Sequence, residues 1–120
     1  MARDLLTPIQ LSRNAGIDAK AATVLTTITV ANGAYIDANA LDTDRLILHV
    51  KNTVGAAKNV TIKAGTYSRA ALGDLVVSVA ATTGETMIHV ETARFKDADG
   101  FVLVDFEAAM TGLAGCYALP

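Results

Sequence analysis

The sequence predicts one all-β domain, an antiparallel β-sandwich with an extended N-terminal arm, and the jelly roll is one form that this sandwich can take. Short runs rich in β-branched residues recur along the chain, with turn residues between them, at the spacing expected of a sandwich or barrel. No stretch shows sustained helical periodicity, and no internal repeat or low-complexity linker marks a second domain. We therefore expect residues 1–22 to form the arm and residues 23–120 to form the sandwich.

The length, net charge and cysteine content of the chain exclude several classes of partner and of stabilising link. A chain of 120 residues is long enough to bury a hydrophobic core without disulfides or a structural metal. A net charge of -2 gives no long-range positive potential, so direct binding of nucleic acid is not expected. Cys116 is the single cysteine, which excludes an intramolecular disulfide and multi-cysteine zinc sites, and its small apolar neighbours predict a buried thiol.

The N-terminal segment contains no apolar run long enough for a signal-peptide core or a membrane span, so we expect synthesis in the cytoplasm and no membrane partner. Pro8 fixes its own φ and biases the residue before it toward extended conformations. The candidate partner-binding residues surround it and are Leu5, Leu6, Pro8, Ile9 and Leu11. They either reach onto a neighbouring molecule or form an edge strand of their own domain, and the sequence leaves both alternatives open.

The clearest local pattern runs from Arg45 to Lys63. Apolar residues alternate with polar ones on both sides of the segment 52–57, which indicates two half-buried strands. The intervening residues tolerate turns and are too few for a crossover helix, so we predict a β-hairpin. The residues predicted to face the core, here and in a later strand, are Leu48, Val50, Val60, Ile62, Val104 and Phe106.

Other strands are expected on both sides of this hairpin. Residues 24–30 and 34–38 read as short strands joined by an Asn32-Gly33 turn, and residues 39–44 form a polar loop into the hairpin. Residues 64–74 are expected to form a long surface loop, a class of segment that often carries function.

The strands and turns after residue 74 are predicted from the same alternation and turn residues. Two alternating runs, 75–79 and 86–90, flank a Thr-Thr-Gly turn and predict a second hairpin, which residues 92–96 could extend. The segment 97–100, Asp-Ala-Asp-Gly, predicts a tight acidic turn. Residues 101–107 and 112–119 are the last two strands.

The candidate catalytic and metal-binding residues do not indicate an enzyme. His49 and His89 fall on the outward faces of strands, with no second ligand at metal-binding spacing, and the acidic turn lacks the later oxygen ligands of a calcium loop. The chain has no Gly-x-Ser-x-Gly elbow, no phosphate-binding glycine loop and no Cys/His nucleophile pair. We predict no catalytic, metal or cofactor site. A carbohydrate-binding module is a weaker alternative, because the chain has no Trp and only three Tyr to stack on sugars.

Several segments resemble small structural proteins encoded near the capsid genes of tailed bacteriophages and prophages. The similarity covers most of the chain and lies chiefly in strand and turn segments. These are Leu-x-Val-x-Asn-Thr at 48–53, Val-Thr-Ile-Lys-Ala-Gly at 60–65, Glu-Thr-Ala-Arg-Phe at 91–95, and Val-Asp-Phe-Glu at 104–107, which leads toward a terminal Leu-Pro.

The resemblance implies a virion protein on the capsid exterior. The implied role is a capsid decoration or cement protein that binds the major capsid protein and stabilises the assembled shell by bridging neighbouring capsomers. Analogy with other decoration proteins favours a homotrimer. A phage tail or head-completion component is the alternative, because related β-sandwich proteins also serve there.

Overall fold

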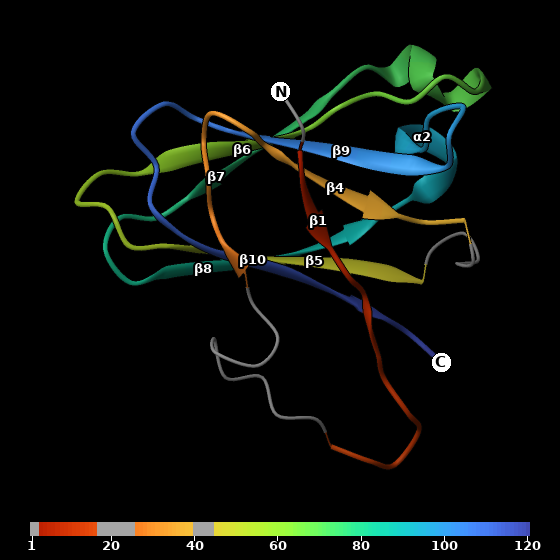
Figure 1. Cartoon of the computed structure of the whole chain (residues 1–120), viewed down its shortest axis with the longest axis horizontal. Coiled ribbons are helices and arrows are strands. Elements are labelled where there is room, and N and C mark those ends of the chain that lie inside the picture. Colours follow the sequence, from red (N-terminus) through yellow and green to blue (C-terminus); the bar gives the residue numbers. More distant parts are fainter. Residues whose placement is uncertain (1–2, 17–25, 40–44) are drawn as a thin grey trace.

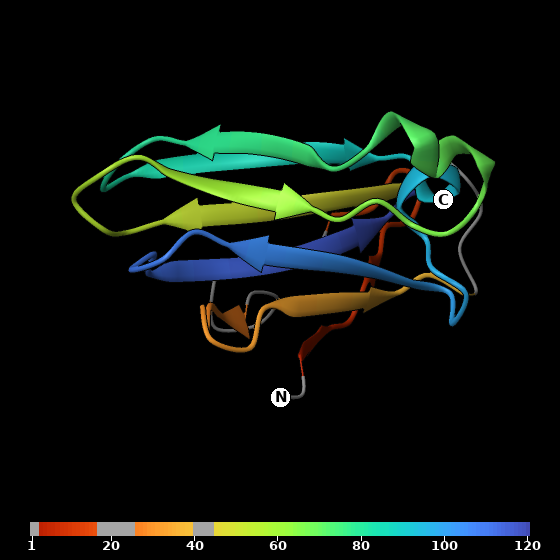
Figure 2. The same cartoon turned by 90° about the horizontal axis from the view of Figure 1, so that it is seen from above.

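The computed structural model describes residues 3–16, 26–39 and 45–120, and it shows a β-sandwich of two sheets packed face to face (Figures 1 and 2). The strands of the first sheet are, in spatial order, β1 (Asp4–Leu6), β4 (Ala34–Asp37), β9 (Phe101–Phe106), β6 (Lys58–Ile62) and β7 (Leu75–Val79). Those of the second sheet are β2 (Ile9–Gln10), β10 (Gly112–Ala118), β5 (Leu46–Asn52) and β8 (Gly84–Val90). The prediction of an all-β sandwich is confirmed.

One very short strand and two short helices complete the described structure. Strand β3 (Thr26–Thr27) pairs with the start of β10, on the same edge as β2. A 3-10 helix, η1 (Ser68–Leu72), lies in the loop between β6 and β7, and a single helical turn, α2 (Thr92–Phe95), follows β8. The helical turn corrects our expectation that residues 92–96 extend the preceding strand.

The sheets are mixed, which corrects the prediction of a purely antiparallel sandwich. Strand β1 runs parallel to β4, and β2 runs parallel to β10, whereas the remaining pairs are antiparallel. The N-terminal segment leaves the first sheet after Leu6 and joins the second at Ile9, with Pro8 in the link. Its described part is extended as predicted, but neither a separate arm nor the jelly-roll form is confirmed.

The two predicted hairpins are wrong in their pairing. Strands β5 and β6 lie in different sheets, and so do β7 and β8. Alternation reports that one face of each strand is buried, and this holds equally for neighbours in one sheet and for strands facing each other across a core. The hairpin that the structure contains is β6–β7, whose strands are joined by the predicted surface loop.

The core lies between the two inner faces. All six residues predicted to face inward are buried, so the phase of the alternation is confirmed. Further buried residues come from nearly every strand and include Leu6, Ile36, Val79, Val90, Val102 and Cys116. The buried thiol predicted for Cys116 is also confirmed, and burial raises its pKa to about 12.

The turns agree with the sequence where they are described. Gly100 N donates to Asp97 O at 3.0 Å, and Asp97 N donates to Phe101 O at 2.9 Å, as expected of the tight acidic turn. The strand predicted at 34–38 is β4. The strand predicted at 24–30 is described from Thr26 onward, where only β3 is a strand, and most of the predicted polar loop at 39–44 lies outside the described residues.

Candidate functional site

The two long edges of the sandwich differ. At one edge, β1 ends the first sheet, and β2 and β3 lie along β10 of the second sheet; we call this the N-terminal edge. At the other edge, β7 ends the first sheet and β8 ends the second. We call β7, β8 and the loop 63–74 the open edge. Figure 2 shows β7 and the loop on the side opposite the N-terminal strands.

Among the residues that the structure describes, most of the exposed large apolar side chains lie on the open edge. Four of these five are Tyr67, Leu72, Val76 and Met87, with exposed fractions of 53%, 60%, 56% and 57%. The fifth, Leu5, lies on β1. Because single exposed apolar residues are common but a concentration along one edge is not, the open edge is the candidate binding surface.

Strand β7 has no feature that would block pairing with another strand. Its sequence, Leu-Val-Val-Ser-Val, contains no charge and no proline, and three of its residues are β-branched. Natural proteins usually blunt exposed edges with charges, proline, bulges or very short strands. An edge that lacks these devices can accept an additional strand.

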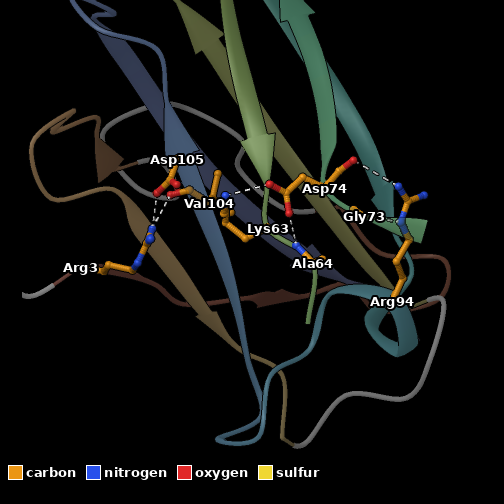
Figure 3. Close-up of polar contacts among 8 residues, drawn as sticks. All are labelled: Arg3, Lys63, Ala64, Gly73, Asp74, Arg94, Val104 and Asp105. Atoms are coloured by element: carbon orange, nitrogen blue, oxygen red, sulfur yellow. Dashed lines mark hydrogen bonds and ion pairs between the residues drawn. The ribbon is translucent and has the colours of Figure 1, made fainter. Parts of the chain in front are cut away.

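An ion pair closes the base of the loop next to β7 (Figure 3). Lys63 Nζ donates to Asp74 Oδ2 at 2.8 Å, and the Ala64 backbone N–H donates to Asp74 Oδ1 at 2.6 Å. These hydrogen bonds lower the pKa of Asp74 and raise that of Lys63. The two ends of the loop are therefore tied together where β7 begins.

Helix α2 holds the rest of the loop. The Arg94 guanidinium donates to the carbonyl oxygens of Gly73, Leu72 and Asp74 at 3.2–3.5 Å, and Gly65 N donates back to Arg94 O at 2.9 Å. Arg69 on η1 also forms an ion pair with Glu91. The loop therefore presents its apolar side chains from a fixed frame, which limits the conformational entropy lost on binding.

Gly65 is needed for this docking. A Cβ atom at this position would lie 2.1 Å from Lys96 O, a distance that no side chain tolerates. Thr66 N also donates to Lys96 O at 3.3 Å. The loop and the end of α2 are therefore in direct backbone contact.

Asn52 secures the other end of the open edge, and sequence reasoning missed it. This side chain is fully buried at the end of β5, and its Nδ2 donates to the carbonyl oxygens of Ala56, Val79 and Ala80 at 3.0–3.3 Å. Its Oδ1 accepts from Val54 N at 3.1 Å. One amide thus ties the connection leaving β5 to the end of β7. The only signal in the sequence is an asparagine at an inward position of a strand, where we expected a turn residue.

The predicted partner-binding residues are bound within their own chain. Leu6 is buried in the core, Pro8, Ile9 and Leu11 are half-buried, and Leu5 alone is exposed. The backbone N–H of Leu11 donates to Ala118 O at 2.8 Å. The described part of the segment therefore serves as an edge strand of its own domain, and binding of a partner through it stays a prediction.

A side-chain contact fixes the start of this segment. Arg3 Nη1 lies 2.6 Å from Asp105 Oδ1 and donates to Val104 O at 3.0 Å, both on β9 (Figure 3). Because β4 lies between β1 and β9, Arg3 reaches across one strand to make these contacts.

The two histidines take no part in a described metal cluster. His49 Nδ1 lies 3.1 Å from Tyr117 Oη, and its Nε2 lies 3.0 Å from Glu85 Oε1. The rings of His49 and Tyr117 stack with their centroids 5.9 Å apart. Within residues 3–16, 26–39 and 45–120, no group of three or more His, Cys, Asp or Glu side chains is placed to hold a metal ion.

Comparisons with protein-family models, with curated proteins and with solved structures each found no significant match to this chain. None of the helices in the described ranges has the length and apolar character needed to cross a membrane.

Proposed function

We propose that this protein is a structural component of a tailed-phage virion, most specifically a capsid decoration or cement protein on the exterior of the shell. The observation that carries the proposal is the open edge, where an uncharged edge strand and exposed apolar side chains are held on a rigid frame. Such a surface suits lasting adhesion to other protein, and the sequence resemblance supports a phage capsid as its setting.

In this proposal the protein acts by binding and catalyses no reaction. A protein that binds the assembled shell but not its separated subunits stabilises the shell by mass action. The proposed partners are the major capsid protein and further copies of the same chain, with a trimer favoured by analogy. Nucleic acid and membrane are not proposed as partners, since the net charge is -2.

Two surfaces are candidates for contact with the shell. The N-terminal residues predicted from the sequence offer exposed Leu5 together with half-buried Pro8, Ile9 and Leu11. The open edge offers more exposed apolar side chains and an unblocked strand. We therefore place the main adhesive surface at the open edge.

Cryo-electron microscopy of the source virion tests the proposal. A decoration protein is expected as density on the outer surface of the capsid at regular positions between capsomers, into which the sandwich fits. Density at the tail or at the head–tail junction would favour the alternative role. Absence of the chain from purified virions by mass spectrometry would reject both roles.

A sugar-binding role receives less support from the geometry. Of the three tyrosines, Tyr67 alone is exposed, whereas Tyr35 is half-buried and Tyr117 is buried. A platform of several aromatic rings is therefore not formed by these residues.

A further inference from the structure

We propose that β7 pairs with β7 of a second copy of this chain, antiparallel about a two-fold axis at Val77, so that the first sheets of the two copies form one continuous sheet. This inference concerns self-association in solution and goes beyond the proposed function. It assigns the backbone edge of β7 to a second copy, and it favours a two-fold pair over the trimer that rests on analogy alone. It rests on the direction of the backbone groups of β7, on the match of the strand with itself, and on the partly covered core beside it.

The hydrogen bonds of β6 fix the direction of the β7 backbone. Lys63 directly follows β6, and its N donates to Leu103 O on β9. Glu107 directly follows β9, and its N donates to Asn59 O on β6. Odd-numbered residues of β6 therefore bond to β9. Because bonded and non-bonded positions alternate along an antiparallel ladder, the even-numbered residues of β6 bond to β7.

The outward groups of β7 follow from its register with β6. The residues opposite the even-numbered positions of β6 are Leu75, Val77 and Val79. The backbone N–H and C=O groups of Val76 and Ser78 therefore point away from the sheet. No hydrogen bond from another described residue reaches these groups, so they are available to an added strand.

The strand is complementary to itself. In antiparallel pairing about Val77, Leu75 lies opposite Val79 of the second copy, and Val76 lies opposite Ser78, which brings the outward groups of both copies together. This register uses the whole strand, whereas a shift to either side shortens the overlap. Since β7 has no charged residue, an isologous contact opposes no like charges.

The core explains why an added copy stabilises this edge. Leu75 and Val77 pack against the core but remain partly exposed, because the first sheet ends with β7. The same two residues of the second copy would cover them and extend the apolar inner face. The burial gained is therefore largest where the single chain leaves its core incomplete.

A cysteine variant tests the register directly. In this arrangement the two Val77 residues form a non-hydrogen-bonded pair, whose Cβ atoms lie about 4.5–5.5 Å apart. Val77→Cys is expected to form an intermolecular disulfide under mild oxidation, on the order of tenfold faster than Val76→Cys. In this register the two Cα atoms at position 76 lie farther apart than about 7 Å, the limit for a disulfide. Wild-type protein is the background control, because its Cys116 is buried.

A proline variant tests the pairing without a cross-link. Ser78→Pro removes an outward N–H and leaves the bonds to β6 intact, so the single chain is expected to keep its fold while pairing is lost. Sedimentation equilibrium is expected to give twice the 12.5 kDa chain mass for wild type and for the control Ser78→Ala, and one chain mass for Ser78→Pro. If Ser78→Pro fails to fold, the cross-linking rates of Val77→Cys and Val76→Cys test the pairing instead.

Three results would overturn the proposal. They are a wild-type protein that stays monomeric at about 100 µM, a trimer whose mass Ser78→Pro does not change, and equal cross-linking at positions 76 and 77. Loss of capsid binding in Ser78→Pro from a monomeric wild type would assign the edge to a strand of the shell instead. Failure of self-pairing would leave the virion role intact, since that role is tested separately by the location of the protein in the particle.

Discussion

The N-terminal edge and the open edge show two treatments of the same physical problem. Both sheets must end somewhere, and every terminal strand exposes unpaired backbone groups. At the N-terminal edge the terminal strands are only two or three residues long, Asp4 carries a charge, and Pro8 has no backbone N–H to donate. At the open edge, β7 is longer and uncharged, and its neighbouring loop displays exposed apolar side chains.

The difference between the two edges indicates where the domain can associate with another protein. Short, interrupted strands discourage an added strand, whereas β7 has no such defence, although one charge would provide it. The rigid loop beside β7 points the same way, because ion pairs and a close glycine contact hold its apolar side chains in a position exposed to water. An apolar residue should therefore stabilise the fold at the N-terminal edge and mediate association at the open edge.

Substituting one leucine at each edge gives the largest expected contrast. Leu6→Ala removes a buried side chain and is expected to lower the free energy of unfolding by about 2–4 kcal/mol, whereas Leu72→Ala, 60% exposed, should change it by less than about 0.5 kcal/mol. Urea denaturation of both variants measures the difference. Equal losses would show that the N-terminal strand is not part of the folded domain, as a separate arm would require.

Asn52→Ala should break the connection between β5 and the end of β7. Carbonyl groups that now accept from the buried amide would lose their donor, and we expect a loss of about 1–3 kcal/mol. Asn59→Ala, an exposed asparagine on β6, is the matched control and should be near neutral. A near-neutral Asn52→Ala would mean that water replaces the amide.

Two glycine substitutions test whether the loop beside β7 is rigidly docked. Gly65→Ala forces a Cβ atom against the Lys96 backbone and is expected to destabilise by about 1–3 kcal/mol and to speed amide exchange in residues 64–74. Gly55→Ala meets no atom within 4 Å and should be neutral or stabilising by up to about 1 kcal/mol. Unchanged exchange in Gly65→Ala would show that the loop does not depend on this contact.

The smallest expected effect concerns the ion pair at the base of the loop. The lowered pKa of Asp74 means that its carboxylate stabilises the fold above the unfolded pKa, near 3.8, and that this stabilisation is lost as the pH falls through the lower folded pKa. Asp74→Asn should therefore cost less than about 1 kcal/mol at pH 7, because solvent screens the pair, and the difference from wild type should vanish at low pH. A difference that persists at pH 2 would assign the effect to packing.

Strand positions and burial could be predicted from the residues, because alternation is a local property of each segment. The period-two pattern correctly identified β5, β6, β7 and β9 and the buried side of each. Pairing could not be predicted, because a buried face carries no mark of which strand lies beside it and which lies across the core. Asn52 shows the limit clearly, since a buried amide that joins two sheets looks like a turn residue in the sequence.

The candidate site follows the same division. The residues alone show that 75–79 is an uncharged strand, that 64–74 is a loop, and that no familiar catalytic motif is present. Only the folded chain decides that this strand ends its sheet, that the loop is held against α2, and that the N-terminal apolar residues lie along the opposite edge. The reason is physical: chemical character belongs to a residue, but exposure of a strand edge depends on which other strands already occupy its sides.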